Sequence, residues 1–79
     1  MIKIENKEIN SYKSNLKRIR VSSGLTQNEL ADLSGINIKS ISAYEQQVDK
    51  INKASADTLY YLAEALNCEI EDIIQKECL

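Results

Sequence analysis

The 79-residue chain contains no proline and only two glycines, Gly24 and Gly35. Proline is the residue that most disrupts a helix, so helices are unobstructed and the two glycines become informative stop signals. Ahead of Gly24, one helix face is outlined by residues at i, i+4, i+7 and i+11, which are Tyr12, Leu16, Ile19 and Ser23. This spacing predicts a first helix that ends at Gly24.

A second and a third helix are predicted on either side of Gly35. Thr26 and Glu29 have the T-x-x-E spacing of a capping box, in which two side chains satisfy the free backbone N–H groups of a helix start. The second helix should turn Leu30, Ala31 and Leu33 inward. Gly35 supplies the positive φ of a tight stop, and Asn37 suits the N-cap of a third helix through Ile41 and Tyr44.

Two further helices are predicted after a polar loop at residues 48–54. Ser55 caps the fourth, which ends at Asn67 in a left-handed conformation. Its apolar face consists of Leu59, Leu62, Ala63 and Leu66, and one of Tyr60 and Tyr61 should also pack inward. The fifth helix begins among Glu69, Glu71 and Asp72 and should bury Ile70, Ile73 and Ile74.

The predicted architecture is all-α, with five helices in one domain over residues 11–79. Residues 1–10 are expected to be a polar tail, with a short strand at Ile2–Ile4 as the alternative. The chain is 43% hydrophobic, so a core is feasible without a metal or a disulfide.

Composition excludes several classes of function. There is no histidine and no glycine-rich phosphate loop, so we expect neither an enzyme nor a cofactor. Cys68 and Cys78 lack the spacing of a metal or redox motif, so they are interpreted as reduced apolar residues, with no metal bound. No apolar run reaches membrane-spanning length, so a cytoplasmic protein is expected, with no membrane partner.

Charge is distributed unevenly along the chain. The net charge is −2, yet residues 1–24 carry +4, residues 25–53 carry −1 and residues 54–79 carry −5. An acidic C-terminal half either faces away from a polyanionic partner or faces a partner protein, and the sequence leaves both open.

The spacing of Ala31, Gly35 and Ile41 carries the functional signal. A small residue allows two helices to cross closely, glycine makes the turn four residues later, and an apolar residue six further on packs the next helix back. Together they indicate the steep crossing of a helix-turn-helix, which places its second helix in the major groove of DNA.

At these residues the chain resembles the phage-repressor and Cro type of helix-turn-helix domain, the XRE family, as a short stand-alone member. The resemblance runs from Leu16 to Ile74. It rests on the ordered segments Leu16–Arg20, Gly24–Ala31, Ser34–Ile36, Ser40–Ser42, Tyr44–Glu45 and Leu59–Leu66. The chain departs from the family after Glu45, where Gln46 and Gln47 replace a glycine turn and the following loop is longer.

The resemblance implies a set of DNA-contacting side chains. Gln27, assisted by Asn28, would hold a phosphate at the start of the second helix. On the third helix, the groove-facing positions are Asn37, Ile38, Lys39, Ser42 and Ala43. Lys39 suits guanine, and Asn37 suits adenine unless capping consumes its side chain. Ser40, Gln46, Lys50 and Lys53 are expected on the DNA backbone. Taken singly, these residues also fit as helix-end or solvated side chains, and only their joint placement favours DNA.

The resemblance also pairs Arg20, at the end of the first helix, with Glu45, at the end of the third. We interpret this pair as a structural salt bridge and not as a DNA contact.

The leading hypothesis is a sequence-specific DNA-binding transcriptional regulator, a repressor that inserts its third helix into double-stranded DNA. Only one charge stands among the groove-facing positions, so a homodimer is expected, with Ile70, Ile73, Ile74 and Leu79 as candidate contacts of which the isoleucines also suit the core. The alternative is an antitoxin-like partner whose acidic C-terminal half binds another protein.

Overall fold

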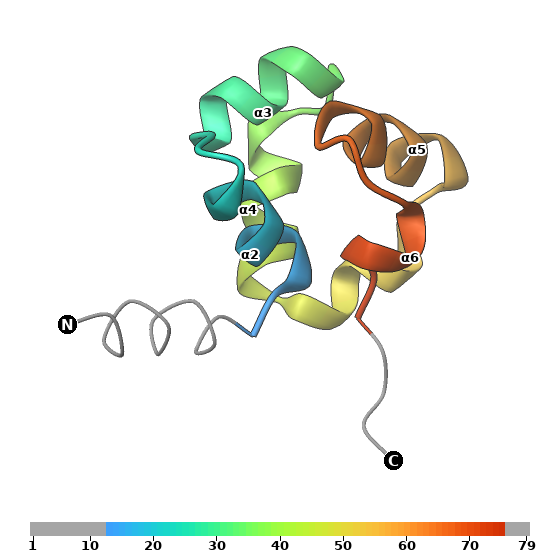
Figure 1. Cartoon of the computed structure of the whole chain (residues 1–79). Helices are drawn as coiled ribbons and strands as arrows, with labels where there is room; N and C mark the ends of the chain where they lie inside the picture. The colour runs from blue at the N-terminus through green and yellow to red at the C-terminus, as the bar shows by residue number, and fades with distance from the viewer. Residues whose placement is uncertain (1–12, 76–79) are drawn as a thin grey trace, which may run out of the picture.

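Local capping sets the helix boundaries. The computed structural model describes residues 13–75, and within them every helix of eight residues or more begins at a side chain that accepts a hydrogen bond from the first turn. The elements are α2 (Asn15–Ser22), α3 (Gln27–Ser34), α4 (Ile38–Gln46), the 3₁₀ helix η1 (Val48–Lys53), α5 (Ala56–Ala65) and α6 (Ile70–Ile73) (Figure 1). The expected all-α fold is confirmed.

The capping residues are those that the sequence indicates. Thr26 accepts from the Glu29 N–H while the Glu29 carboxylate accepts from the Thr26 N–H, which completes the capping box of α3. The Asn37 and Ser55 side chains cap α4 and α5. Gly35 and Asn67 have φ values of 74° and 55°, so both helix stops use the left-handed region that was predicted.

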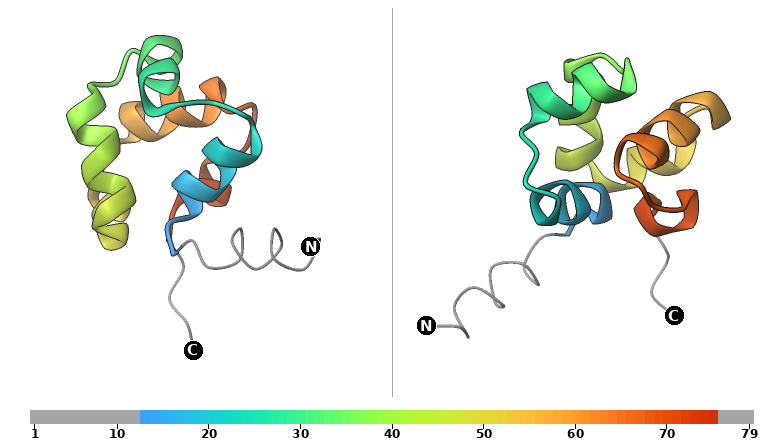
Figure 2. Two further views of the ribbon diagram at one scale, coloured as in Figure 1. Left: turned by 90° about the vertical axis from the view of Figure 1, so that its left-hand side faces the viewer. Right: turned by 45° about the horizontal axis from the view of Figure 1, so that its top comes forward.

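The core takes one fully buried large side chain from each of these six elements. They are Leu16, Leu30, Ile41, Ile51, Leu62 and Ile73. Figure 2 shows the helices arranged around this centre, with α3 and α4 at one side and α5 and α6 at the other. Every element therefore contributes to one shared core, which Ala63 and Leu66 complete.

Residues 48–54 were predicted as a loop, and this prediction was wrong for most of the segment. Val48–Lys53 forms η1, with Ile51 buried and Val48 half-buried. A 3₁₀ helix has three residues per turn, so its inward positions recur every third residue instead of every third and fourth. That period leaves no amphipathic α-helical pattern, although Val48, Ile51 and Ala54 do recur at intervals of three.

Two expected core positions are also wrong, namely Leu33 and the one tyrosine of Tyr60 and Tyr61 that should pack inward. Leu33 is 63% exposed because Leu30 and Ser34, four residues apart, occupy the inward side of α3. Tyr60 and Tyr61 are 51% and 49% exposed, so neither packs inward. Leu59, Leu62, Ala63 and Leu66 already fill the inward face of α5, which leaves both tyrosines outside in edge-to-face contact at 5.7 Å.

The isoleucines of α6 divide into different environments. Ile73 is fully buried, Ile74 is half-buried and Ile70 is 36% exposed. The predicted buried face of three isoleucines is therefore wrong at Ile70. A four-residue helix makes only about one turn, and Ile73 is its one fully buried residue. Ile73 is also removed from the candidate dimer contacts. Tyr12, Leu79 and the predicted tail at residues 1–10 lie outside the described residues.

Asn67 offers a test of the α5 stop. Its positive φ favours glycine, so Asn67→Gly is expected to raise the free energy of unfolding by about 0.5–1 kcal/mol, and Asn67→Ala to lower it by about 1 kcal/mol. Urea unfolding followed by circular dichroism measures both. Equal stability of the two variants would contradict the assigned backbone conformation.

Candidate DNA interface

The turn between α3 and α4 is held by backbone conformation and by one buried hydroxyl. Gly35 ends α3 in the left-handed conformation, and its N–H donates to the Ala31 carbonyl. The buried Ser34 Oγ accepts from the Ile36 N–H at 3.1 Å. Three residues therefore suffice to pass from α3 to α4, and the two helices cross at a steep angle (Figure 2).

A buried ion pair fixes the far end of α4. The Arg20 Nε and one terminal guanidinium nitrogen of Arg20 donate to the two oxygens of Glu45, at 2.7 and 3.1 Å. Both residues are only 8% exposed. The other guanidinium nitrogen donates to the Leu25 carbonyl at 2.6 Å, in the loop before α3. One side chain of α2 thus holds both α4 and the entry to α3, through a bidentate pair that fixes orientation.

Gln27 joins the same group. Its Nε2 donates to the Glu45 carboxylate at 3.0 Å, so the start of α3 is tied to the end of α4. A carboxylate only accepts, so this contact orients the amide of Gln27 with its nitrogen toward Glu45. The amide keeps one N–H for another acceptor. Sequence reasoning missed this bond, because a contact between residues 27 and 45 has no signal in local spacing.

The outward face of α4 is composed mostly of small and polar side chains. Ile41 and Glu45 are buried on the inner side, and Ile38, three residues before Ile41, is half-buried beside them. At 100° per residue, the opposite side carries the predicted positions Lys39, Ser40, Ala43 and Gln46. Lys39 and Gln46 are exposed, whereas Ser40, Ser42 and Ala43 are half-buried. The structure therefore brings most predicted α4 positions to one surface, with Ile38 half-buried at the border of that surface.

Asn37 is engaged as a cap. Its Oδ1 accepts from the Lys39 N–H at 2.7 Å, which leaves only its Nδ2 to donate. Pairing with adenine needs one donor and one acceptor, so the cap already occupies one of the two lone pairs of the oxygen that this pairing would use. Asn28 is exposed in the first turn of α3, where N–H groups point toward solvent.

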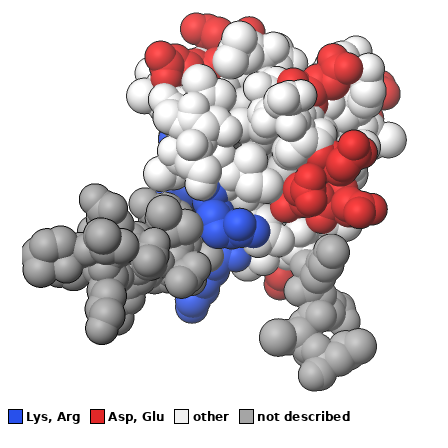
Figure 3. Space-filling view, viewed as in Figure 1, with Lys and Arg blue, Asp and Glu red and all other residues white. Residues whose placement is uncertain are grey.

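The surface around α4 and η1 is more basic than the net charge suggests. Lys39, Lys50 and Lys53 are exposed, whereas Glu45 is buried and neutralised by Arg20. The face in Figure 3 lies on the other side of the molecule from α4, and it shows acidic atoms around α5 and α6 and over α3, with basic atoms near α2. Charge is therefore segregated in space as well as along the chain.

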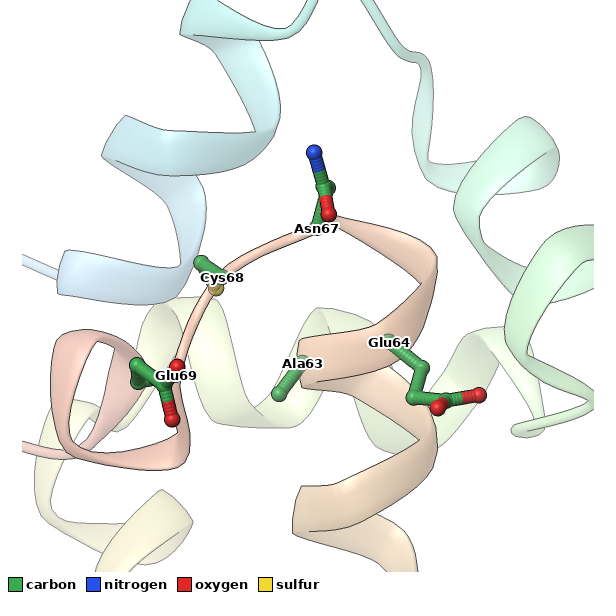
Figure 4. Close-up of a pocket in the computed structure, with 5 residues that line it drawn as sticks. All are labelled: Ala63, Glu64, Asn67, Cys68 and Glu69. Atoms are coloured by element: carbon green, nitrogen blue, oxygen red, sulfur yellow. The ribbon is translucent and has the colours of Figure 1, made fainter.

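A hollow lies beside the turn from α5 to α6. Ala63, Glu64, Asn67, Cys68 and Glu69 line it (Figure 4). Burial raises the pKa of the Cys68 thiol, and Asp72 and Glu69 raise it further, so the thiol is a poor nucleophile near neutral pH. Within residues 13–75, no group of three or more acidic or cysteine side chains is placed to hold a metal ion.

The helices of this same span, residues 13–75, are too short or too polar to cross a membrane.

Two short helices that cross steeply at a glycine turn, with the second presenting a polar outer face, define a helix-turn-helix DNA-binding fold. A family model described as helix-turn-helix matches residues 16–73, and the chain belongs to this XRE-type helix-turn-helix family. It is accordingly a DNA-binding transcription regulator. Searches of curated proteins and of solved structures found no match.

The ion pair generates a stability prediction. Arg20→Ala leaves the Glu45 carboxylate buried without its cation, so it is expected to lower the free energy of unfolding by about 3–5 kcal/mol. Arg18→Ala, on the same helix, is the matched control and removes only a hydrogen bond to Asn15. Urea unfolding measures both. A melting curve of Arg20→Ala that matches the wild type would remove the structural role.

Proposed function

We propose that this protein is a sequence-specific repressor that inserts α4 into the major groove and binds DNA as a homodimer. The observation that carries the proposal is the division of α4 into two faces. Ile41 and Glu45 anchor one face inside the domain, and Lys39, Ser40, Ala43 and Gln46 stand on the other. A helix anchored on one side with small polar residues on the other suits entry into a groove about 12 Å wide.

Base recognition is assigned to the start and middle of α4. Lys39 donates to O6 or N7 of a guanine, and Ala43 contacts a thymine methyl group. Ser42 and the exposed edge of Ile38 border this surface. Asn37 donates through Nδ2, the group that its cap leaves free. The code is short, because Lys39 is the one charged group among these positions.

Backbone contacts are assigned to both sides of α4. Gln27 and Asn28 present N–H groups at the start of α3, where the helix dipole also favours a phosphate. Gln27 adds the second N–H of its amide, which Glu45 holds in place. On α4 itself, Ser40 and Gln46 flank the groove, and beyond α4, Lys50 and Lys53 reach the phosphates from η1.

Dimerisation compensates for the short code. Two copies placed about one helical turn apart, roughly 34 Å, double the number of bases contacted. A dimer bound to a two-fold operator that overlaps a promoter would block transcription from that promoter, which is the basis for proposing repression.

One observation favours a protein partner as a second function. Glu64 and Glu69 border the hollow at the α5–α6 turn, and acidic atoms gather around these helices on the face away from α4 (Figure 3). That face stays accessible when α4 occupies DNA. An antitoxin-like role, in which a basic protein binds there, is therefore compatible with DNA binding by the same chain.

Selection from random double-stranded DNA with the purified protein tests the proposal. A two-fold symmetric site and a protein mass of two chains on that site are expected. If the protein retards neither this DNA nor its own promoter fragment at low salt, yet co-purifies with a neighbouring gene product, the partner-binding function replaces the first.

Lys39 provides the sharpest residue-level prediction. Lys39→Ala is expected to weaken binding to the selected site and to reduce discrimination at one guanine by about 1–3 kcal/mol, without lowering the melting temperature. Fluorescence anisotropy with the selected site and with a variant lacking that guanine measures both effects. Lys13→Ala, an exposed lysine before α2, is the control. Equal discrimination by Lys39→Ala and the wild type would defeat the assignment.

A further inference from the structure

The period of a 3₁₀ helix sorts the side chains of η1 onto three edges. Residues three apart lie directly above one another, so the half-buried Val48 lies on the same edge as Ile51, which is buried in the core. Lys50 and Lys53 share a second edge, which is cationic, and about 6 Å of rise separates them. Asp49 and Asn52 share the third. The two lysines therefore project together, directly after the helix assigned to the major groove.

Asn52 binds the segment that follows α6. Its Nδ2 donates to the Gln75 carbonyl at 2.7 Å, and its Oδ1 accepts from the Gln75 N–H at 2.8 Å. One side-chain amide thus satisfies both backbone groups of a residue 23 positions away. Two parallel hydrogen bonds define an orientation that a single bond would leave free.

The same segment is fastened to the start of α2. The Gln75 Oε1 accepts from the Asn15 N–H at 2.6 Å, and its Nε2 donates to the Lys13 carbonyl at 3.0 Å. The Asn15 Nδ2 donates to the Ile74 carbonyl at 2.8 Å. In Figure 1, η1 lies between the start of α2 and the end of α6, where these bonds converge. We call the group Asn15, Asn52 and Gln75 the polar clamp.

The local hydrogen bonds of η1 are weak by comparison. Its N-cap, Gln47, makes no side-chain capping bond, and Ile51 is its only fully buried residue. A 3₁₀ helix also has poorer hydrogen-bond geometry than an α-helix. The orientation of the cationic edge therefore depends strongly on the polar clamp. The orientation of α4 depends on it less, because Ile41 and Glu45 are both buried.

We infer that Asn52 and Gln75 are positioning residues for DNA binding, which hold Lys50 and Lys53 against the phosphate backbone. This inference rests on the proposed function. Asn52 and Gln75 are uncharged, so any direct contact that they made with DNA would leave counterion release unchanged. An effect of these residues on salt dependence must therefore pass through the lysines.

The test measures DNA affinity against salt concentration for Asn52→Ala and Gln75→Ala, below the melting temperature of every variant. Each phosphate contact contributes about 0.9 to the slope of log affinity against log salt. Asn52→Ala is expected to reduce the slope by one to two units, roughly, and to weaken binding on the order of tenfold at about 0.1 M salt. Gln75→Ala, which leaves the two bonds of Asn52 possible, is expected to have a smaller effect in the same direction.

Two controls separate positioning from general destabilisation. Asn67→Ala strains a turn outside the polar clamp and is expected to lower the melting temperature without changing the slope. In a Lys50→Ala/Lys53→Ala background, Asn52→Ala is expected to change affinity less than about twofold, because the contacts that it positions are already absent.

The outcomes are distinct. An unchanged slope for Asn52→Ala, or an equal loss of affinity in both backgrounds, overturns the positioning role while leaving the proposed function intact. If the wild type and the Lys50→Ala/Lys53→Ala variant bind DNA with the same salt slope, the lysines do not contact the DNA backbone. That result refutes this inference as well. Failure of the wild type to bind any DNA contradicts the proposed function itself.

Discussion

The pairing of Arg20 with Glu45 is the contact on which the arrangement of the DNA-facing elements depends. Through it, α2 holds the end of α4, the loop at Leu25 and, by way of Glu45, the start of α3 at Gln27. Burying two charges costs desolvation energy that the attraction only partly offsets, so apolar residues of similar size can give equal stability. Apolar residues cannot supply the fixed geometry of a guanidinium that donates to both oxygens of a carboxylate. That geometry, together with the buried Ile41, holds the inner face of α4 inside the domain.

The same carboxylate links stability to DNA binding. Glu45 accepts from Arg20, a purely internal partner, and from Gln27, which stands at the surface. If Gln27 holds a phosphate as proposed, its amide is already oriented by Glu45, so less rotamer entropy would be lost on binding. Asn37 shows the opposite arrangement, in which the internal hydrogen bond occupies one lone pair of the acceptor that base recognition would use.

Features that depend on neighbouring residues could be predicted from the sequence, and features that depend on distant ones could not. The capping box at Thr26, the glycine stop at Gly35 and the left-handed Asn67 follow from local backbone chemistry. Leu33 and one of the two tyrosines were wrongly predicted to face the core, because periodicity gives the apolar side of a helix but not how much of that side the other helices cover. η1 was missed because only the α-helical and strand periods were considered, although Lys50 and Lys53 recur at three. The bonds of Gln27 to Glu45 and of Asn52 to Gln75 join residues with no sequence relation.

The charge distribution explains how a chain with a net charge of −2 serves a polyanion. Net charge sets solubility and long-range repulsion, whereas binding depends on the field at the surface that makes contact. Around α4 and η1, Glu45 is neutralised inside the fold, and the exposed Asp49 offsets only one of the three exposed lysines, Lys39, Lys50 and Lys53. On the face away from α4, acidic atoms lie around α5 and α6 and over α3, and basic atoms lie near α2 (Figures 2 and 3). If α4 enters the groove as proposed, the acidic side chains around α5 and α6 are turned away from DNA and do not oppose binding.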